Sequence, residues 1–322
     1  MRSTLPPLPP AVSGARHTFQ SAAGPLSYYT SVPPDPAEAV HHAPLLLIHS
    51  VNAAASAYEV RPLYEHYRGI RSVYAPDMPG FGFSDRSDRD YTPRLMTDAV
   101  HAMVTEIRRV HGPAPIDAVA VSLSCEFLAR AVNEAPGAFR SVALVSPTGF
   151  NRAEPHYGPP GSTRGMPLLR SLFTRPPWSR GFFDLLTSRP SVRYFLQKTW
   201  GSKNIDVGLL DYDCLTTRQP GARHAPYCFV SGFLFSGDIS RIYESIELPV
   251  WMAHGVRGDF VDYRYKATVQ ARPNWTIRVF QTGALPYFEA LEEFAREYDA
   301  FLERAHAGRE RDEATVISTK EL

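Results

Sequence analysis

Six short apolar runs recur along the chain, and the stretches between them have helical periodicity. Each run is rich in apolar or β-branched residues and is bounded by turn residues; the runs are 44–50, 72–76, 116–122, 141–147, 248–255 and 275–282. Continuous rather than alternating apolarity is typical of parallel strands that are buried on both faces. Strands that alternate with helices predict an α/β fold with a doubly wound, mostly parallel sheet.

The clearest helical pattern spans residues 92–111, where apolar residues recur close to every 3.6 positions. Thr92 and Pro93 give this helix a start signal, with threonine as the cap and proline at the first helical position. Residues 125–135 and 286–305 show similar periodicity. Near the start, 17–20 and 26–30 are expected to form an antiparallel hairpin at the edge of the sheet.

The alternation stops between residues 150 and 245, a segment rich in proline and aromatic residues that contains no clear strand. We predict a mostly helical lid there, lying over the carboxyl ends of the strands, where such sheets bind ligands. Most of its aromatics would form the lid's own core, and the others would line a pocket. The α/β core then comprises 16–149 and 246–306, while the Pro-rich 1–15 and the polar 307–322 are expected to be disordered.

Composition excludes several classes of protein. With 34 basic and 33 acidic residues, the chain as a whole is expected to have no field that attracts nucleic acid or an anionic membrane. Cys125, Cys214 and Cys228 form no C-x-x-C pair, so neither a disulfide framework nor a zinc site is expected. Prolines near the N-terminus interrupt any signal-peptide core, and no apolar run is long enough for a membrane span. We expect a cytoplasmic protein.

The strongest chemical signal is the hexapeptide Ala-Val-Ser-Leu-Ser-Cys at 120–125, which follows an apolar strand and opens an amphipathic helix. A tight strand-to-helix turn strains its central residue and requires small neighbours two positions away. Ala120 and Ser124 meet that requirement. Ser122 is therefore a candidate nucleophile; alternatively, Ser122 and Ser124 only cap the helix.

Other motifs occur in a recognisable order around this turn. A strand ends in His49-Ser50, the segment Asp-Met-Pro-Gly-Phe-Gly-Phe-Ser at 77–84 follows the next strand, and a Gly-x-x-Pro-x-x-Glu segment at 283–289 follows the last. Together with the nucleophile turn and the lid, they resemble the lid-containing, esterase- and lipase-like members of the α/β-hydrolase superfamily. The resemblance covers about residues 25–305.

The resemblance implies roles for particular residues. Backbone N–H groups of Leu123 and of Val51 or Asn52 would form the oxyanion hole, with Ser50 at the position of the family's glycine and His49 bracing the loop. Asp259 in the segment His-Gly-Val-Arg-Gly-Asp aligns best with the family's acid; alternatively, it only forms a turn after Gly258.

The family's general base is a histidine that follows glycine after the last strand, and here that position holds Ala284. Without a base, a serine hydroxyl is a weak nucleophile at neutral pH. Two residues are candidate substitutes: His224 in the lid, and Tyr287, whose phenol is a better donor than base.

Three functions remain open from the sequence. The first is hydrolysis of an apolar carboxylic ester by Ser122 in an atypical triad. The second is a non-hydrolytic member of the superfamily, such as a lyase, isomerase or cyclase. The third is a catalytically silent protein that binds a hydrophobic ligand. No cofactor or metal is expected, because no phosphate-binding glycine motif opens a helix after a strand.

Overall fold

Eight strands form one sheet in the order β1-β2-β4-β3-β5-β6-β7-β8. The computed structural model describes residues 7–33, 42–151, 155–175, 177–260 and 262–320, with side chains up to residue 307. β1 and β2 form an antiparallel edge hairpin, β2 pairs antiparallel with β4, and all other neighbours are parallel. The strands are β1 (Ala15–Ser21), β2 (Gly24–Ser31), β3 (Leu45–Ile48), β4 (Val73–Asp77), β5 (Ile116–Val121), β6 (Phe139–Val145), β7 (Val250–Gly255) and β8 (Trp275–Phe280).

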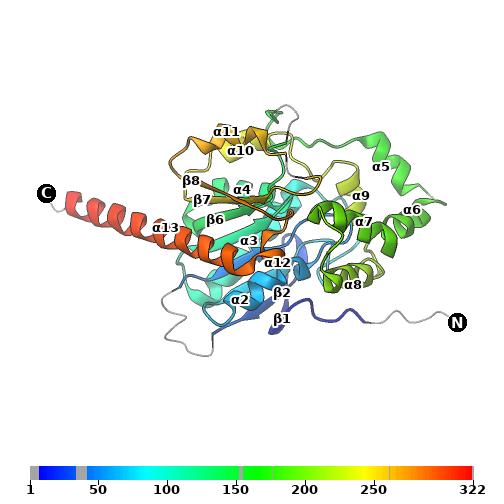
Figure 1. The fold of residues 1–322 in the computed structure, drawn as a ribbon, viewed down its shortest axis with the longest axis horizontal. Coiled ribbons are helices and arrows are strands. Elements are labelled where there is room, and N and C mark those ends of the chain that lie inside the picture. The colour runs from blue at the N-terminus through cyan, green and yellow to red at the C-terminus, as the bar shows by residue number, and fades with distance from the viewer. Residues whose placement is uncertain (1–6, 34–41, 152–154, 176, 261, 321–322) are drawn as a thin grey trace.

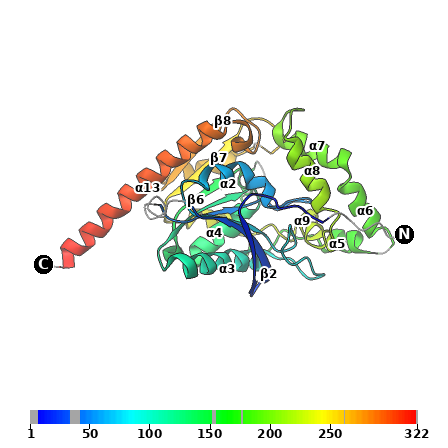
Figure 2. The ribbon, with the colours of Figure 1, turned by 90° about the horizontal axis from the view of Figure 1, so that it is seen from below.

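Helices cover both faces of the sheet, as Figure 2 shows with α3 and α4 on one side and α2 and α13 on the other. One face of the sheet packs against α3 (Pro93–His111), α4 (Ser124–Glu134), α10 (Ile239–Glu244) and α11 (Ala267–Gln270). The opposite face packs against α2 (Arg61–Tyr67) and α13 (Leu291–Lys320). Short helices η1 (Ala57–Val60), η2 (Pro136–Ala138), η3 (Arg264–Lys266) and α12 (Pro286–Glu289) complete the core. The predicted doubly wound α/β fold is confirmed.

Local signals account for the element boundaries. The hydroxyl of Thr92 accepts a hydrogen bond from the N–H of Leu95, and Pro93 opens α3, as the start signal predicts. β3 and β5 are buried along their whole length, which explains their unbroken apolarity. Both central strands end at the same edge of the sheet, so the loops that follow them meet there.

Between β6 and α10, the chain forms five helices at one end of the molecule, opposite the free end of α13 (Figure 1). We call residues 155–237 the insertion; its helices are α5 (Pro167–Thr174), α6 (Ser179–Leu186), α7 (Arg189–Trp200), α8 (Val207–Thr216) and α9 (His224–Val230). α10 follows the insertion and packs on α4 of the core. Phe150 and Tyr243, which flank the insertion, stack on each other with centroids 4.7 Å apart.

No helix in the described part of the chain is both long enough and apolar enough to cross a membrane.

Both terminal segments differ from the prediction of disorder. The described part of the Pro-rich segment is packed: Leu8, Ala11 and Val12 join the core on the α2 side, and Ser13 hydrogen-bonds Glu65. These few apolar residues suffice to dock an extended segment. Residues 307–320 continue α13 as a helix, in a stretch that contains several strong helix formers. Residues 1–6, 321 and 322 lie outside the described residues.

The loop after β4 is fixed to η1 by one carboxylate. Asp77 Oδ1 accepts a hydrogen bond from the N–H of Ala57 at 2.9 Å, and its Oδ2 accepts one from Phe83 at 2.9 Å. Gly82 has φ +49°, and a Cβ there would lie within about 2 Å of the Asp77 carboxylate. Only glycine fits at this position, which gives the Asp-x-Pro-Gly-x-Gly-x-Ser segment a physical reason.

Candidate active site

Ser122 stands at the turn between β5 and α4 with φ 54°, one of two non-glycine residues in the described chain with positive φ. Its N–H donates to the carbonyl of Val145 on the neighbouring strand at 2.8 Å, which holds the turn in place. Ser124 Oγ donates to the carbonyl of His49 at 2.6 Å and ties the turn to the loop after β3. The Ser122 side chain is partly exposed, and no described residue hydrogen-bonds its hydroxyl.

Two backbone donors beside this turn are unused. Leu123 is the N-terminal flanking residue of α4, and Val51 begins the loop after β3; both residues are buried. Neither N–H has a hydrogen-bond partner among the described residues. Because buried N–H groups in native proteins are nearly always paired with protein or with ordered water, these two donors can receive an acceptor such as a water molecule or a carbonyl oxygen.

The loop after β3 is held by a buried ring and a buried carboxylate. His49 accepts from the N–H of Met78 through Nε2, at 2.9 Å, and its Nδ1 lies 2.5 Å from the carbonyl of Ser50. Glu59, 5% exposed, accepts from the N–H of Ser50 at 2.8 Å and from Asn52 Nδ2 at 2.7 Å. His49 is thus a bracing residue, as expected, whereas sequence reasoning missed Glu59. A single glutamate in a helix of four residues gives no sign of its hydrogen-bond partners.

Asp259 is not placed as the predicted acid would be. Its carboxylate forms an ion pair with Lys198 of α7 at 3.0 Å, and its side chain is 55% exposed. The N–H of Asp259 also donates to the carbonyl of Lys198. Asp259 therefore joins the insertion to the loop after β7, and an exposed carboxylate paired with a lysine is poorly suited to orient a buried base.

Ala284 lies under the end of α7. Its N–H donates to the carbonyl of Thr199 at 2.9 Å, and a Cβ on the preceding Gly283 would lie 2.5 Å from Trp200 Cα. From below, Ser146 Oγ donates to the Ala284 carbonyl at 2.5 Å. The loop that contains Ala284 is thus enclosed by the insertion on one side and by the end of β6 on the other.

The two candidate substitutes for the base are engaged elsewhere. His224 Nδ1 lies 3.1 Å from Asp88, and burial lowers the pKa of His224 while Asp88 partly opposes that shift. Tyr287 is fully buried and donates its hydroxyl to the carbonyl of Glu59 at 2.9 Å; burial raises its pKa well above the usual value. Within the described residues, neither side chain hydrogen-bonds Ser122.

A second polar cluster, missed from the sequence, lies at the ends of β6 and β7. The rings of His254 and Tyr263 stack with centroids 4.0 Å apart, and His254 Nε2 lies 3.0 Å from Lys266 Nζ. Burial raises the pKa of Tyr263, and the Ser146 hydroxyl beside it partly offsets this. His254, Tyr263 and Lys266, together with Asp259, line a cavity of about 510 Å³.

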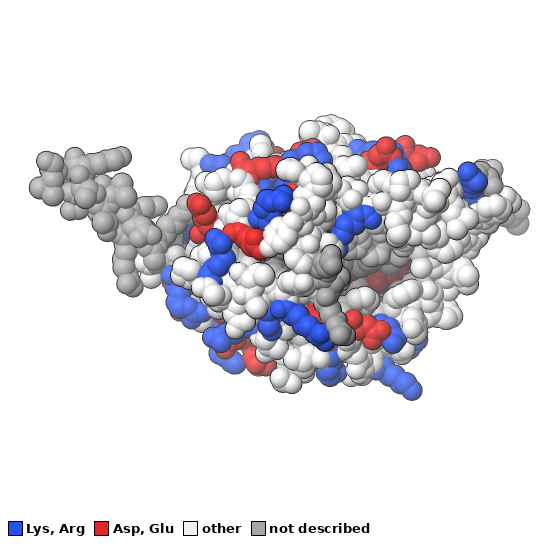
Figure 3. Space-filling view, turned by 90° about the horizontal axis from the view of Figure 1, so that it is seen from above, with Lys and Arg blue, Asp and Glu red and all other residues white. Residues whose placement is uncertain are grey.

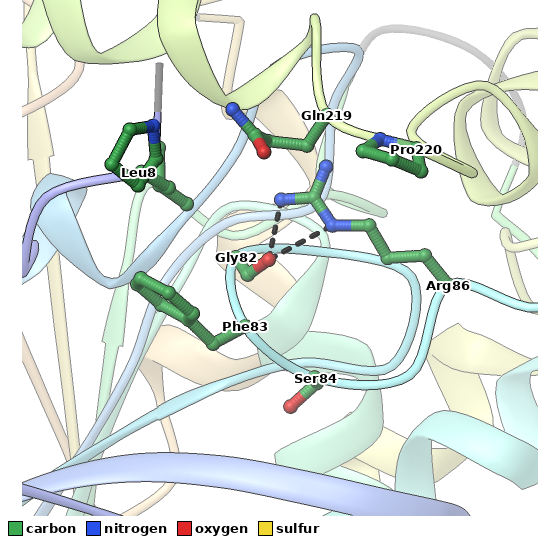
Figure 4. Close-up of a pocket in the computed structure, with 8 residues that line it drawn as sticks. Leu8, Gly82, Phe83, Ser84, Arg86, Gln219 and Pro220 are labelled. Atoms are coloured by element: carbon green, nitrogen blue, oxygen red, sulfur yellow. Dashed lines mark hydrogen bonds between the residues drawn. The ribbon is translucent and has the colours of Figure 1, made fainter. Parts of the chain in front are cut away.

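A different cavity, of about 430 Å³, separates the N-terminal segment from the loop after β4 (Figure 4). Arg86 crosses it, donating from Nε to the carbonyl of Gly82 at 2.9 Å and from Nη1 to the carbonyl of Thr216 at 2.7 Å. Leu8 and Phe83 form the opposite wall. Ser122 lines neither cavity, so the sequence expectation of an aromatic pocket over Ser122 stays a prediction.

One buried ion pair fixes the insertion to the helix that Ser122 introduces. Glu126 on α4 has no exposed surface, and its Oε1 accepts from Arg164 Nη2 at 2.9 Å while its Oε2 accepts from the N–H of Ser236 at 2.7 Å. Arg164 and Ser236 belong to the start and the end of the insertion. Burial raises the pKa of Glu126, and Arg164 opposes that shift.

Cys125 is fully buried, and burial raises the pKa of its thiol well above the usual value. A neutral, enclosed thiol is a packing group. Among the described residues, no group of three or more His, Cys, Asp or Glu side chains is arranged to hold a metal ion.

Comparison with known proteins identifies the family. Residues 45–297 match the model of the "Alpha/beta hydrolase family". Similar solved structures include a serine hydrolase involved in carbazole degradation, with TM-score 0.69, 14% identity and coverage of 90% of this chain and 99% of that one. An epoxide hydrolase is similar with TM-score 0.68 and 15% identity, and the match covers 90% of this chain and 99% of the epoxide hydrolase. A thermophilic esterase from Thermogutta terrifontis is similar with TM-score 0.65 and 13% identity, and the match covers 91% of this chain and 100% of the esterase. No curated protein sequence gave a match. The family match spans most of the chain and the fold agrees with it, so this protein belongs to the alpha/beta hydrolase family.

Proposed function

We propose that this chain is a slow hydrolase of small apolar carboxylic esters, with Ser122 as nucleophile. The observation that carries the proposal is the arrangement of Ser122, Val51 and Leu123. A strained, partly exposed serine with an unengaged hydroxyl stands beside two buried N–H groups that have no partner among the described residues. Donors fixed in this way stabilise the negative charge that develops on a carbonyl oxygen under attack.

The proposed ester hydrolysis needs no cofactor. Ser122 Oγ bonds to the ester carbonyl carbon, and the N–H groups of Val51 and Leu123 hold the oxyanion. The C–O bond then breaks, the alcohol leaves with the serine proton, and water hydrolyses the acyl-serine. With Ala284 in the base's position, water must carry the proton, and a site lacking one member of a triad retains roughly 10³–10⁴-fold catalysis over water. Asp259 has no part in these steps, because it is paired with Lys198.

Covalent labelling tests the role of Ser122. The protein is incubated with a fluorophosphonate probe, and the modified peptide is identified by mass spectrometry. We expect label on Ser122 that is lost in Ser122→Ala. Ser146→Ala is a matched control, because Ser146 is the other left-handed serine at a strand end but donates its hydroxyl to Ala284. Unlabelled but correctly folded wild-type protein would rule out the proposal.

Placing a histidine at position 284 tests whether the rest of the proposed site can support catalysis once a general base is present. A positioned general base contributes about 10²–10⁴-fold to such a reaction. We expect Ala284→His to raise hydrolysis of an aryl butyrate at least 10²-fold, with Ala284→Gln as a control of similar bulk but no basic nitrogen. An equal effect of both substitutions would show that packing, not a base, had changed.

A non-covalent reaction or ligand-binding role is the second candidate. The observation that favours it is the lack of any described hydrogen-bond acceptor at Ser122 Oγ. In that case, turnover or binding of a carbonyl ligand would survive Ser122→Ala, because only the two N–H groups would be needed.

A further inference from the structure

The insertion carries a concentration of positive charge that the rest of the chain lacks. Residues 164–203 contain eight basic residues and one acidic residue, Asp184, whereas outside this segment acidic residues outnumber basic ones by 32 to 26. Four of the eight pair with carboxylates of Glu126, Asp90, Asp211 and Asp259. The other four are exposed and have no ion pair among the described residues; they are Arg175, Arg180, Arg193 and Lys203.

Large apolar side chains are exposed on the same helices. α5 has no buried residue, and Leu168 in it is 89% exposed; Leu185 in α6 is 71% exposed. Trp178, between these helices, is 52% exposed and donates its Nε1–H to the carbonyl of Leu172. Leu172 on α5 and Phe195 on α7 are also exposed. Leu168 and Leu185, the two most exposed large apolar side chains of the described chain, thus lie on neighbouring helices of the insertion.

These apolar side chains are not left over from an incomplete core. Inside the insertion, Phe173 and Phe182 stack with centroids 4.5 Å apart, and Phe183 packs edge-on against Tyr227. On α6, Phe183 is buried while Leu185 points to solvent. The helices therefore have a satisfied inner face and a separate apolar outer face.

Seen from above, the insertion end of the molecule shows a broad uncharged surface with basic atoms at its outer edge (Figure 3). Exposed leucines and a tryptophan next to unpaired arginines match the chemistry of a membrane interface, where aromatic rings lie at headgroup level and cations attract anionic lipids. We infer that the outer face of α5, α6 and α7 docks on the surface of a bilayer that contains anionic phospholipids.

Charge complementarity selects this partner over an uncharged apolar one. Each Lys or Arg near an anionic leaflet contributes attraction within about one Debye length, roughly 10 Å at 0.1 M salt. The net negative charge of the rest of the chain would be repelled by the same surface. The molecule would thus bind with the insertion toward the lipid and α13 away from it (Figure 1).

Vesicle co-sedimentation tests the electrostatic part. The full chain is mixed with phosphatidylcholine vesicles that do or do not contain about one third phosphatidylglycerol, at about 50 mM and about 0.5 M salt. We expect binding only to the anionic vesicles and only at low salt. Arg180→Glu/Arg193→Glu should weaken it by about tenfold or more. The matched control is Arg296→Glu/Arg304→Glu, which reverses two exposed arginines of α13 and should leave binding unchanged.

Tryptophan fluorescence tests the apolar part. Of the four tryptophans, Trp200, Trp251 and Trp275 are buried, so Trp178 alone can meet lipid without unfolding. Brominated phosphatidylglycerol vesicles should quench wild-type emission, and Trp178→Phe should abolish that quenching. Equal binding to neutral vesicles, an equal loss in both arginine pairs, or quenching that persists in Trp178→Phe would each overturn the inference, as would capture by an acidic protein without any vesicle binding.

This inference is independent of the proposed chemistry. Ser122→Ala removes the nucleophile and leaves α5, α6 and α7 unaltered, so it should bind vesicles as the wild type does. A failure of the esterase assay would therefore not affect membrane docking, and the reverse also holds.

Discussion

Ser122 and Ser146 end the adjacent parallel strands β5 and β6, and both adopt left-handed backbone conformations, with φ 54° and 48°. A left-handed conformation costs a non-glycine residue roughly 1–2 kcal/mol. The two serines differ in their hydroxyls, because Ser146 donates to the Ala284 carbonyl and Ser122 has no described partner. Strain at Ser122 is therefore not offset by a side-chain contact, as is usual where a turn presents a reactive group.

Glycine at position 122 should accordingly stabilise the protein. Ser122→Gly relieves the left-handed strain at some cost in unfolded-chain entropy, so we expect the free energy of unfolding to rise by about 0.5–1 kcal/mol. Ser122→Ala keeps the strain and should stay within about 0.5 kcal/mol of wild type. Urea denaturation measures both; a destabilised glycine variant would show that the serine side chain stabilises the turn.

The approach of Gly82 to Asp77 predicts a large steric effect. Ala at position 82 would place its Cβ against the Asp77 carboxylate in a left-handed conformation, so Gly82→Ala should lower the free energy of unfolding by about 3 kcal/mol or more. Gly69→Ala is the control, because nothing lies within 4 Å of a Cβ there. If thermal denaturation gave similar midpoints for the two variants, the loop after β4 would be adaptable rather than fixed by Asp77.

Asp117 predicts the acid sensitivity of the fold. Its buried carboxylate accepts hydrogen bonds from Arg71 at 2.5 Å, Arg140 Nε at 3.0 Å and Ser141 at 2.7 Å, and the two arginines hold its pKa below the usual value against the effect of burial. A lowered native pKa gives stability that is present above the unfolded pKa, near 4, and is lost as pH falls through the native pKa.

Asp117→Asn should therefore lower the free energy of unfolding at pH 7 by about 3–5 kcal/mol, since it leaves the buried Arg71 and the partly buried Arg140 without their anion. The loss should shrink as pH falls below about 4, where the unfolded wild-type chain takes up a proton at this carboxyl before the folded protein does. Asp98→Asn, at an exposed pair with Arg94, should cost less than about 1 kcal/mol. Asp117 lies at the far end of β5 from Ser122, so fluorophosphonate labelling of folded protein should not change.

The sheet and the turn at Ser122 could be predicted because their signals are local. Ile116–Val121 is almost continuously apolar and is followed at once by a helix, so the strand and the turn at Ser122 are both specified within a short segment. The helical insertion could be predicted for the same reason. Most boundaries shifted by only a few residues, as expected where capping and fraying decide them, whereas the helix expected over 286–305 divides at Ala290 and continues to residue 320.

The surroundings of Ser122 could not be predicted, because they depend on contacts between distant segments. Asp259 turns outward since Lys198, in the insertion, offers a cation there. Glu126 occupies the first turn of α4, a place where an exposed glutamate is ordinary, and its burial depends on Arg164 and Ser236, which are distant in the sequence. No local sequence pattern distinguishes a buried carboxylate such as Glu126 from an exposed one such as Asp259. The acid expected from the order of the motifs is therefore exposed, and the buried carboxylate is a different residue.

Asp213 on α8 gives a prediction of the opposite sign to that for Asp117. This carboxyl is buried, its Oδ1 has no partner among the described residues, and Glu59 and Asp206 lie near enough to add to the effect of burial, which raises its pKa well above the usual value. A raised native pKa gives stability that is present below the unfolded pKa, near 4, and is lost as pH rises toward the native pKa. Asp213→Asn keeps the shape and removes the titration. It should raise the free energy of unfolding by about 1–3 kcal/mol at pH 8 and have little effect at pH 4.

Asp211→Asn is the matched control for this prediction, because Asp211 is on the same helix but exposed and paired with Arg189 at 2.5 Å. Urea denaturation of the three proteins at both pH values gives the comparison, and the control should stay close to wild type throughout. If Asp213→Asn instead lost stability at pH 8, Asp213 would be ionised and held by a cation in the folded protein. Such a result would show that α8 does not bring a neutral acid close to Glu59.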